Sequence, residues 1–198
     1  MHMVSNRRIG AEDSKSRTAL LDAAEQIMLE QGYAAVSSRR IAERADLKPQ
    51  LVHYYFRTMD DLFLAAFRRR AEIGLEHLTT ALDSGEPLRV LWAFGDDPTS
   101  TALNMEFVAL ANHRKSIRSE IARYAELFRA RQAEALAAVM EERGIDTGRF
   151  PPIAVMTVMT AVAQILVLEE ALGMVAGHAE TRTMVTHILD GFGSGATP

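Results

Sequence analysis

Apolar residues along this chain recur at intervals of three and four positions, the spacing that places side chains on one face of an α-helix. Gly32 follows the first such segment, at a place where glycine commonly ends a helix. No segment alternates apolar and polar residues as strands do, so the pattern predicts an all-α fold. The first predicted helix spans about residues 14–31, capped by Ser14 or Ser16, with its apolar face at Leu20, Ala23, Ala24, Ile27 and Met28.

Two short helices joined by a tight turn are predicted between residues 37 and 56. Ser37 or Ser38 can cap the first helix, because a serine hydroxyl accepts a hydrogen bond from the unpaired amides of a first turn. Asp46 and Leu47 form the turn. Pro49 suits the first position of the second helix, where its missing N–H costs nothing.

The second of these short helices has a narrow predicted core face. Val52 and Phe56, four residues apart, are its expected buried contacts. A helix with few core residues and many polar or aromatic ones is typical of a helix that enters the DNA major groove. The side chains left on its other faces are Gln50, Leu51, His53, Tyr54 and Tyr55.

The pattern after residue 57 predicts further helices, about nine in total. Thr58 can cap the first of them, and Thr99 or Ser100 a later one. These helices cover about residues 58–82, 87–94, 99–113, 115–143, 153–172 and 179–189, and a glycine-rich tail covers 191–198. The helix over 115–143 has an apolar stripe made of Ile117, Ile121, Tyr124, Leu127, Phe128 and Leu136.

Composition narrows the class of protein. An apolar content of 48% is enough for a sizeable core, and the absence of cysteine excludes disulfides and thiolate sites. The N-terminus lacks the pattern of a signal peptide. The apolar stretch Ile153–Leu168 is short for a transmembrane span and contains Gln164. We therefore expect a cytoplasmic protein.

Charge is unevenly distributed along the chain. Residues 1–70 hold 12 Lys and Arg against 9 Asp and Glu, a net charge of +3, whereas residues 71–198 hold 10 against 17, a net charge of −7. A basic first third on an acidic remainder is the distribution expected of a DNA-binding head on a body that does not bind DNA.

Two basic stretches lie outside the predicted core. Arg7 and Arg8 belong to an N-terminal arm without periodicity, which can reach a phosphate or the minor groove, or can remain solvated. Arg68–Arg70 lie on the helix over 58–82. They either contact the DNA backbone or, as we favour, form a solvated face or pair with Glu72 and Glu76.

The segment ALLDAAEQIMLEQGYAAVSSRRIAERADLKPQLVHYYFRTMDDLFLAAF resembles the DNA-binding domain of the TetR family of transcriptional regulators. The matching features are the LLDAAE…GY first helix, the IAERA second helix, the HYYF that ends the third helix and the following DDL. The resemblance covers about residues 15–67. It implies a helix-turn-helix head at residues 1–57 and a helical body for ligand binding and dimerisation at residues 58–198.

The chain departs from the family pattern at four positions. Asp46 replaces the usual glycine of the turn, and Lys48 replaces the serine or threonine that often caps the reading helix. His53 stands in place of a frequent tyrosine, and Met59 in place of a lysine that often contacts a phosphate.

The family pattern implies particular DNA contacts. Arg39 would read a guanine edge and Gln50 would bond an adenine, whereas Ser38, Tyr54 and Thr58 suit phosphates. The alternative for His53 and Tyr55 is a packing role. The full set of predicted DNA-binding residues is Ser38, Arg39, Lys48, Gln50, Leu51, His53, Tyr54 and Thr58.

The body is expected to hold a pocket for a small, largely apolar effector, because methionine and aromatic side chains adapt to such ligands. Ordinary core is the alternative for each residue. Polar residues within apolar helices are further clues, since a buried polar group needs a partner: Asn104, Glu106, Asn112, His113 and Gln164. The predicted ligand-binding residues are Trp92, Asn104, Met105, Phe107, Phe128, Met156, Met159 and Gln164.

The segment over 153–172 is apolar on nearly all sides, and a helix of that kind must be buried on all sides. Together with the last helix it predicts a four-helix bundle between two copies of the chain. The alternative is that both are internal core helices. The predicted dimer-interface residues are Ile153, Val158, Val162, Ile165, Met184 and Ile188.

These observations predict a regulator, most often a repressor in this family, that binds a palindromic operator as a dimer and is released by its effector. We expect no enzyme activity, metal or cofactor, because the sequence has no GxSxG, P-loop, HExxH or glycine-rich dinucleotide motif and its histidines lack ligand spacing. The alternative is a helical small-molecule-binding protein or enzyme with no DNA-binding role.

Overall fold

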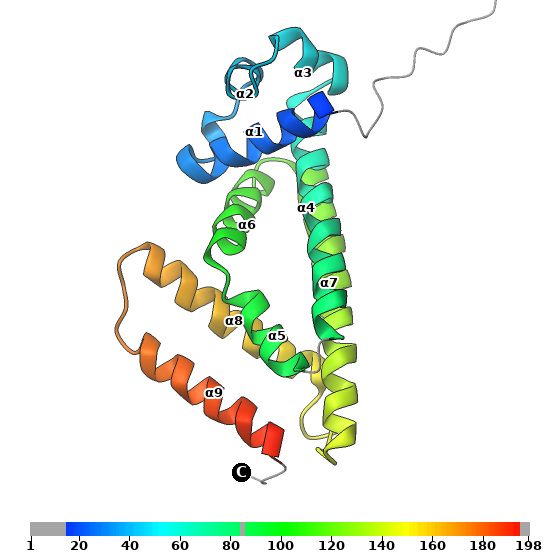
Figure 1. Cartoon of the computed structure of the whole chain (residues 1–198), viewed down its shortest axis with the longest axis vertical. Helices are drawn as coiled ribbons and strands as arrows, with labels where there is room; N and C mark the ends of the chain where they lie inside the picture. Colours follow the sequence, from blue (N-terminus) through cyan, green and yellow to red (C-terminus); the bar gives the residue numbers. More distant parts are fainter. Residues whose placement is uncertain (1–14, 84–85, 195–198) are drawn as a thin grey trace, which may run out of the picture. The chain divides into compact units, whose positions relative to one another are not determined.

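The computed structural model describes residues 15–83 and 86–194, with side chains through residue 191. All regular structure within these ranges is helical, so the predicted all-α fold is confirmed (Figure 1). Ser14 and the arm with Arg7 and Arg8 lie outside the described residues. The helices are α1 (Lys15–Gln31), the 3-10 helix η1 (Tyr33–Ala35), α2 (Ser38–Arg44), α3 (Pro49–Tyr55), α4 (Met59–Leu82), α5 (Pro87–Gly95), α6 (Pro98–Ala111), α7 (Lys115–Glu142), α8 (Pro152–Ala171) and α9 (His178–Ser194).

The described chain forms two compact units. The first contains residues 15–71 and 103–121, and the second contains residues 72–83, 86–102 and 122–194. Each unit is thus assembled from separate parts of the chain, and α4, α6 and α7 contribute to both.

The core of the first unit begins with the apolar face predicted for α1. Leu20, Leu21 and Ala24 on α1 are fully buried, as are Ile41 and Ala42 on α2. Burying a leucine or isoleucine side chain stabilises a fold by about 1.5–3 kcal/mol, so these side chains contribute to the packing of α1, α2 and α3 on one another.

The second part of the first unit includes a buried aromatic pair. Phe107 on α6 is fully buried, and its ring meets that of Phe67 on α4 edge-to-face at a centroid distance of 5.3 Å. Arg114 forms an ion pair with Asp60, and its guanidinium lies over the ring of Phe63.

The basic run on α4 is paired, but not with the carboxylates expected from sequence. Arg68 Nε lies 2.7 Å from Glu120 Oε1. Arg69 Nη2 lies 2.7 Å from both Asp22 Oδ1 and Glu25 Oε1 on α1. Carboxylates from α1 and α7 thus pair with these two arginines, and none of Glu120, Asp22 and Glu25 was among the partners expected from sequence.

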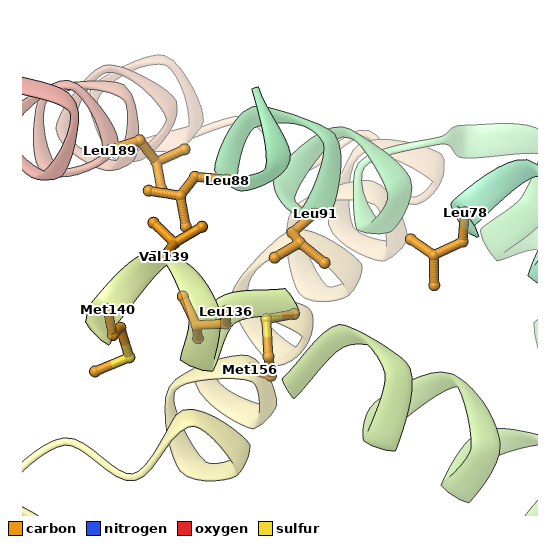
Figure 2. Close-up of a cluster of buried hydrophobic side chains, with 8 residues drawn as sticks. All are labelled: Leu78, Leu88, Leu91, Leu136, Val139, Met140, Met156 and Leu189. Atoms are coloured by element: carbon orange, nitrogen blue, oxygen red, sulfur yellow. The ribbon is translucent and has the colours of Figure 1, made fainter. Parts of the chain in front are cut away.

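The second unit has one central apolar cluster, drawn in Figure 2. The cluster is formed by the C-terminal part of α4 together with side chains from α5, α7, α8 and α9. A Cβ at Gly95 would lie 2.9 Å from the Cβ of Ala163, so only glycine permits the close approach of α5 to α8. The buried members of the cluster are Leu78, Leu88, Leu91, Leu136, Val139, Met140, Met156 and Leu189.

Three local predictions differ from the structure. Asp97, not Thr99 or Ser100, caps α6: its Oδ2 accepts from the Ser100 N–H at 2.8 Å. Leu127, predicted on the buried stripe of α7, is 45% exposed. The last helix runs through Ser194 instead of ending near Leu189, because a glycine inside a helix costs only about 1 kcal/mol relative to alanine and can be tolerated there.

A polar network fixes the connection between α8 and α9. Arg182 on α9 donates from Nε and Nη2 to the two carboxylate oxygens of Asp96, and from Nη1 to Glu170 Oε1 at 2.6 Å. His178 is 4% exposed, with Nε2 2.8 Å from Glu169 Oε2. The hydrogen bonds from Arg182 hold the pKa of the Glu170 carboxyl below its ordinary value.

Candidate DNA-binding helix, effector region and exposed apolar helices

The turn between α2 and α3 has the geometry predicted from its residues. Ser37 caps α2, its hydroxyl accepting from the Arg40 N–H at a long 3.4 Å. Asp46 has φ 53°, the left-handed conformation in which glycine is most at ease. Lys48 precedes α3 without a side-chain capping bond, and Pro49 occupies the first turn. The predicted weak cap of α3 is therefore confirmed.

Helix α3 buries one narrow face and leaves the rest accessible, as its sequence predicted. Val52 is 1% exposed and Phe56 3%. Gln50, His53 and Tyr54 are exposed, with Tyr54 at 54%. The exposed side therefore carries an amide, an imidazole and a phenol, groups that can all form hydrogen bonds.

Leu51 and Tyr55 lie at the border of this face, both half-buried. The Tyr55 ring meets Tyr54 edge-to-face at 5.0 Å and lies 6.4 Å from the Phe56 ring. Tyr55 thus packs between its neighbours, whereas the packing alternative does not describe His53, which is exposed.

The arginines of α2 divide into two kinds. Arg39 is exposed, beside the half-buried Ser38. Arg40 donates to the Ala35 carbonyl at 3.1 Å. Arg44 forms a bidentate ion pair with Glu30, from Nη1 to Oε1 at 2.8 Å and from Nη2 to Oε2 at 2.6 Å. Two of the three arginines are therefore bound to the α1–η1 region, and Arg39 is the one that extends from α2 without such a bond.

The turn before α4 is a reciprocal cap. The Asp61 N–H donates to Thr58 Oγ1 at 3.1 Å, and the Thr58 N–H donates to Asp61 Oδ2 at 3.0 Å. This confirms Thr58 as the cap of α4. Arg57, which the sequence reasoning missed, is exposed next to it. Its signal was a cation two residues before Met59, where the family pattern has a lysine.

The predicted effector residues fall into both units. Four of them gather in the second unit: Met156 is fully buried, and the half-buried Trp92, Phe128 and Met159 pack against its cluster. Of the remaining ones, Phe107 belongs to the core of the first unit, and the others are exposed: Asn104, Met105 at 43%, and Gln164.

Most polar residues that the sequence suggested as buried are not. Asn104, Asn112, His113 and Gln164 are exposed, so solvent satisfies them and they need no ligand. Glu106 is half-buried and accepts a hydrogen bond from the Tyr33 N–H at 2.6 Å. Among the described residues no group of His, Asp and Glu side chains has the geometry of a metal site.

Two aromatic residues near Phe128, Phe94 and Tyr124, were not among the predicted effector-binding residues. Phe94 on α5 lies 5.6 Å from Phe128 on α7, centroid to centroid. A Cβ at Gly74 would lie 3.0 Å from Phe128 Cζ, so the glycine leaves room for this ring. Tyr124, one turn earlier on α7, donates to Glu72 Oε1 at 2.8 Å, and burial raises the pKa of its hydroxyl.

Helices α8 and α9 expose apolar side chains. By length and composition alone, helix α8 could cross a membrane: its most apolar 18 residues have a mean hydropathy of 1.8. Only 22% of these residues are buried within the protein. The buried face of α8 is limited to Met156, Ala163, Leu166 and Val167. Of the predicted interface residues, Val162 is half-buried and the others are exposed: Ile153 47%, Val158 63%, Ile165 45%, Met184 55% and Ile188 49%.

Comparison with known proteins identifies the head. Residues 20–66 match the family model described as bacterial regulatory proteins, tetR family. The HTH-type transcriptional regulator BetI of Rhizobium meliloti (strain 1021) is 38% identical over 61 residues, which are 31% of this chain and 30% of that protein. The matched part thus spans less than a third of the curated relative.

Solved structures share this fold over most of the chain. A TetR-family transcriptional regulator from Rhodococcus sp. gives a TM-score of 0.70 at 19% identity, over 89% of this chain and 98% of that one. A transcriptional regulator from Saccharomonospora viridis in complex with choline gives 0.69 at 16% identity, over 90% and 96%. The chain thus has the fold of solved TetR-family regulators. Its residues 20–66 form a domain of the tetR family of bacterial regulatory proteins.

Proposed function

We propose that this protein is a ligand-responsive, DNA-binding transcriptional regulator. It acts in the cytoplasm as a repressor that binds a palindromic operator as a dimer and is released by a small, largely apolar effector. The observation that carries this proposal is the exposed hydrogen-bonding face of α3, within a segment that matches the tetR family.

The proposed reading surface combines α3 with Arg39 and the turn before α4. Gln50 and Arg39 present the side chains that pair with adenine and guanine edges. Lys48, Tyr54 and Thr58 contact phosphates, and Arg57 takes over the role of the lysine that is absent at Met59. Leu51 contributes an apolar contact and His53 a hydrogen bond at the groove.

Dimerisation is proposed through α8 and α9. In a single chain these helices expose Val158, Ile165, Met184 and Ile188 to water, and a second copy would cover them. The exposure of these residues argues against the alternative that both are internal core helices. Two-fold symmetry would also place two α3 helices on the two halves of a palindrome.

The effector is proposed to bind in the second unit, beside Trp92, Phe94, Phe128 and Met159. Aromatic and methionine side chains adapt to apolar ligands and to the methyl groups of organic cations. A solved neighbour binds choline, so choline belongs among the compounds to test. Trp92 is the single tryptophan of the chain, and its fluorescence reports binding at this place directly.

The test of DNA binding is gel retardation with fragments from the protein's own promoter region and a fragment library, at two salt concentrations. We expect a sequence-specific shift that weakens as salt increases, because bound phosphates release counterions. Absence of any such shift on all fragments would contradict the proposal. A Trp92 response to a compound in the same protein would then favour the alternative, a helical small-molecule-binding protein.

A further inference from the structure

The backbone N–H of Tyr33 has an acceptor far away in the sequence. Tyr33 follows the end of α1, and its N–H donates to Glu106 Oε2 on α6 at 2.6 Å. Both residues are half-buried and lie in the same compact unit. A hydrogen bond to a carboxylate is about twice as strong as one between neutral groups, so this contact is a firm link between α6 and the end of α1.

The turn that receives this link is otherwise held by its own backbone. Gly32 has φ 81° and donates to the Met28 carbonyl at 2.9 Å, which closes α1. The Ala35 and Val36 N–H groups donate to the carbonyls of Gly32 and Tyr33. Among the described residues the Tyr33 N–H has no backbone acceptor within the turn, and its acceptor is the Glu106 carboxylate on α6.

The turn leads directly into the helix-turn-helix. Ser37, the cap of α2, comes four residues after Tyr33, and Arg40 on α2 donates to the Ala35 carbonyl. Helix α3 in turn packs on α2. The turn that leads into α2 and α3 is therefore bonded to Glu106 through the Tyr33 N–H and to Arg40 through the Ala35 carbonyl.

The position of Glu106 on α6 is fixed by the packing of its neighbour Phe107. The next residue, Phe107, is fully buried against the ring of Phe67 on α4. The Glu106 backbone is thereby fixed relative to the first turns of α4. A Cβ at Gly32 would lie 3.5 Å from Glu106 Oε2, an ordinary contact, so the carboxylate rests against the turn without a clash.

We propose that Glu106 is a positioning residue for DNA reading, which acts by holding the Gly32–Tyr33 turn and so the orientation of α2 and α3. The inference rests on the proposed function. Removal of the carboxylate releases the Tyr33 amide and lets the α1–α2 connection adopt other orientations. Only a fraction of molecules then presents α3 in the orientation that binds, and the apparent operator affinity falls by that fraction.

The test compares Glu106→Ala, Glu106→Gln and Val108→Ala in the full chain. Val108 is exposed on the same helix and serves as the control. The measurements are fluorescence anisotropy with a specific operator fragment and with non-specific DNA, and hydrogen exchange of the Tyr33 amide. We expect Glu106→Ala to lose about tenfold in specific affinity and to deprotect Tyr33, while non-specific affinity stays unchanged.

Glu106→Gln keeps an amide oxygen as acceptor, so it should recover most of the specific affinity. A Glu106→Ala protein that is folded, has a deprotected Tyr33 amide and binds the operator as well as wild type overturns the positioning role. If that variant does not fold, equal exchange of the Tyr33 amide in Glu106→Gln and Glu106→Lys overturns it instead. A wild-type chain that binds no DNA refutes the proposed function itself, which is a different result.

Discussion

Helices α3 and α8 both present an exposed face, but the two faces have opposite chemistry. On α3 the exposed positions include Gln50, His53 and Tyr54. On α8 they include Val158 and Ile165. Exposed polar side chains form hydrogen bonds with water and can exchange them for hydrogen bonds to a polar partner. Exposed apolar side chains gain free energy only when a partner removes them from water. Exposure alone therefore does not define a binding surface, because the chemistry of the exposed atoms selects the partner.

The largest effect is expected where charge is placed on the apolar face. Val158→Asp should weaken the proposed dimer at least about a hundredfold, because symmetry buries two unpaired carboxylates in one interface. Sedimentation velocity over a concentration series measures the shift to monomer. Ala138→Asp, at an exposed position of α7, is the control and should leave the oligomeric state unchanged. Equal behaviour of the two variants would remove α8 from the interface.

The next effect tests the polar face. Gln50→Ala should cost about 1–3 kcal/mol of discrimination at one base pair, because a side chain with two hydrogen-bonding groups is lost. Lys48→Gln should instead weaken binding to all sequences alike and reduce the slope of log affinity against log salt by about 1. Binding-site selection and salt titration distinguish the two. An unchanged site preference in Gln50→Ala would mean that α3 is not the reading helix.

A smaller effect concerns the turn that holds the polar face in place. Asp46 has φ 53°, so Asp46→Gly should raise the free energy of unfolding by about 0.5–1 kcal/mol, as relief of backbone strain outweighs the entropy of glycine. Asp46→Ala should lower it, because alanine lacks the polar side chain that favours this conformation. Urea denaturation measures both. Stabilisation by alanine would show that backbone conformation is not what limits this turn.

The smallest effect is a pH dependence of the α8–α9 connection. Arg182 holds the folded-state pKa of Glu170 below its ordinary value, so the contribution of this pair is present above that ordinary value and is lost as the pH falls through the lowered pKa. Arg182→Met should therefore lose less stability than wild type between pH 7 and pH 3.5. Urea midpoints at the two pH values measure the difference. Arg44→Met, which removes the partner of Glu30, is the matched variant in the head.

Much of the fold could be read from local pattern. The boundaries of α2, α3 and α4, the caps Ser37 and Thr58 and the buried pair Val52 and Phe56 follow from side chains within a few residues of each other. Such features depend on helical periodicity and on short-range hydrogen bonds, which a sequence displays directly.

The failures concern contacts between distant segments. The partners of Arg68 and Arg69, on α7 and α1, are not visible in the sequence near α4. The exposure of Leu127 and Gln164 depends on which neighbours pack beside α7 and α8. Periodicity predicts that a helix has an apolar face, but it does not predict how much of that face another helix covers.

The sequence by itself determined the all-α architecture, the helix-turn-helix and the exposed polar face of α3, since these follow from local spacing and from a motif within residues 20–66. Tertiary structure alone decided that Arg39 extends from α2 while Arg40 and Arg44 are bound to the end of α1 and η1. It also decided that the apolar surface of α8 is left uncovered. The physical reason is that burial and pairing are properties of what packs against a residue, and packing partners are chosen by the fold and not by neighbours in the chain.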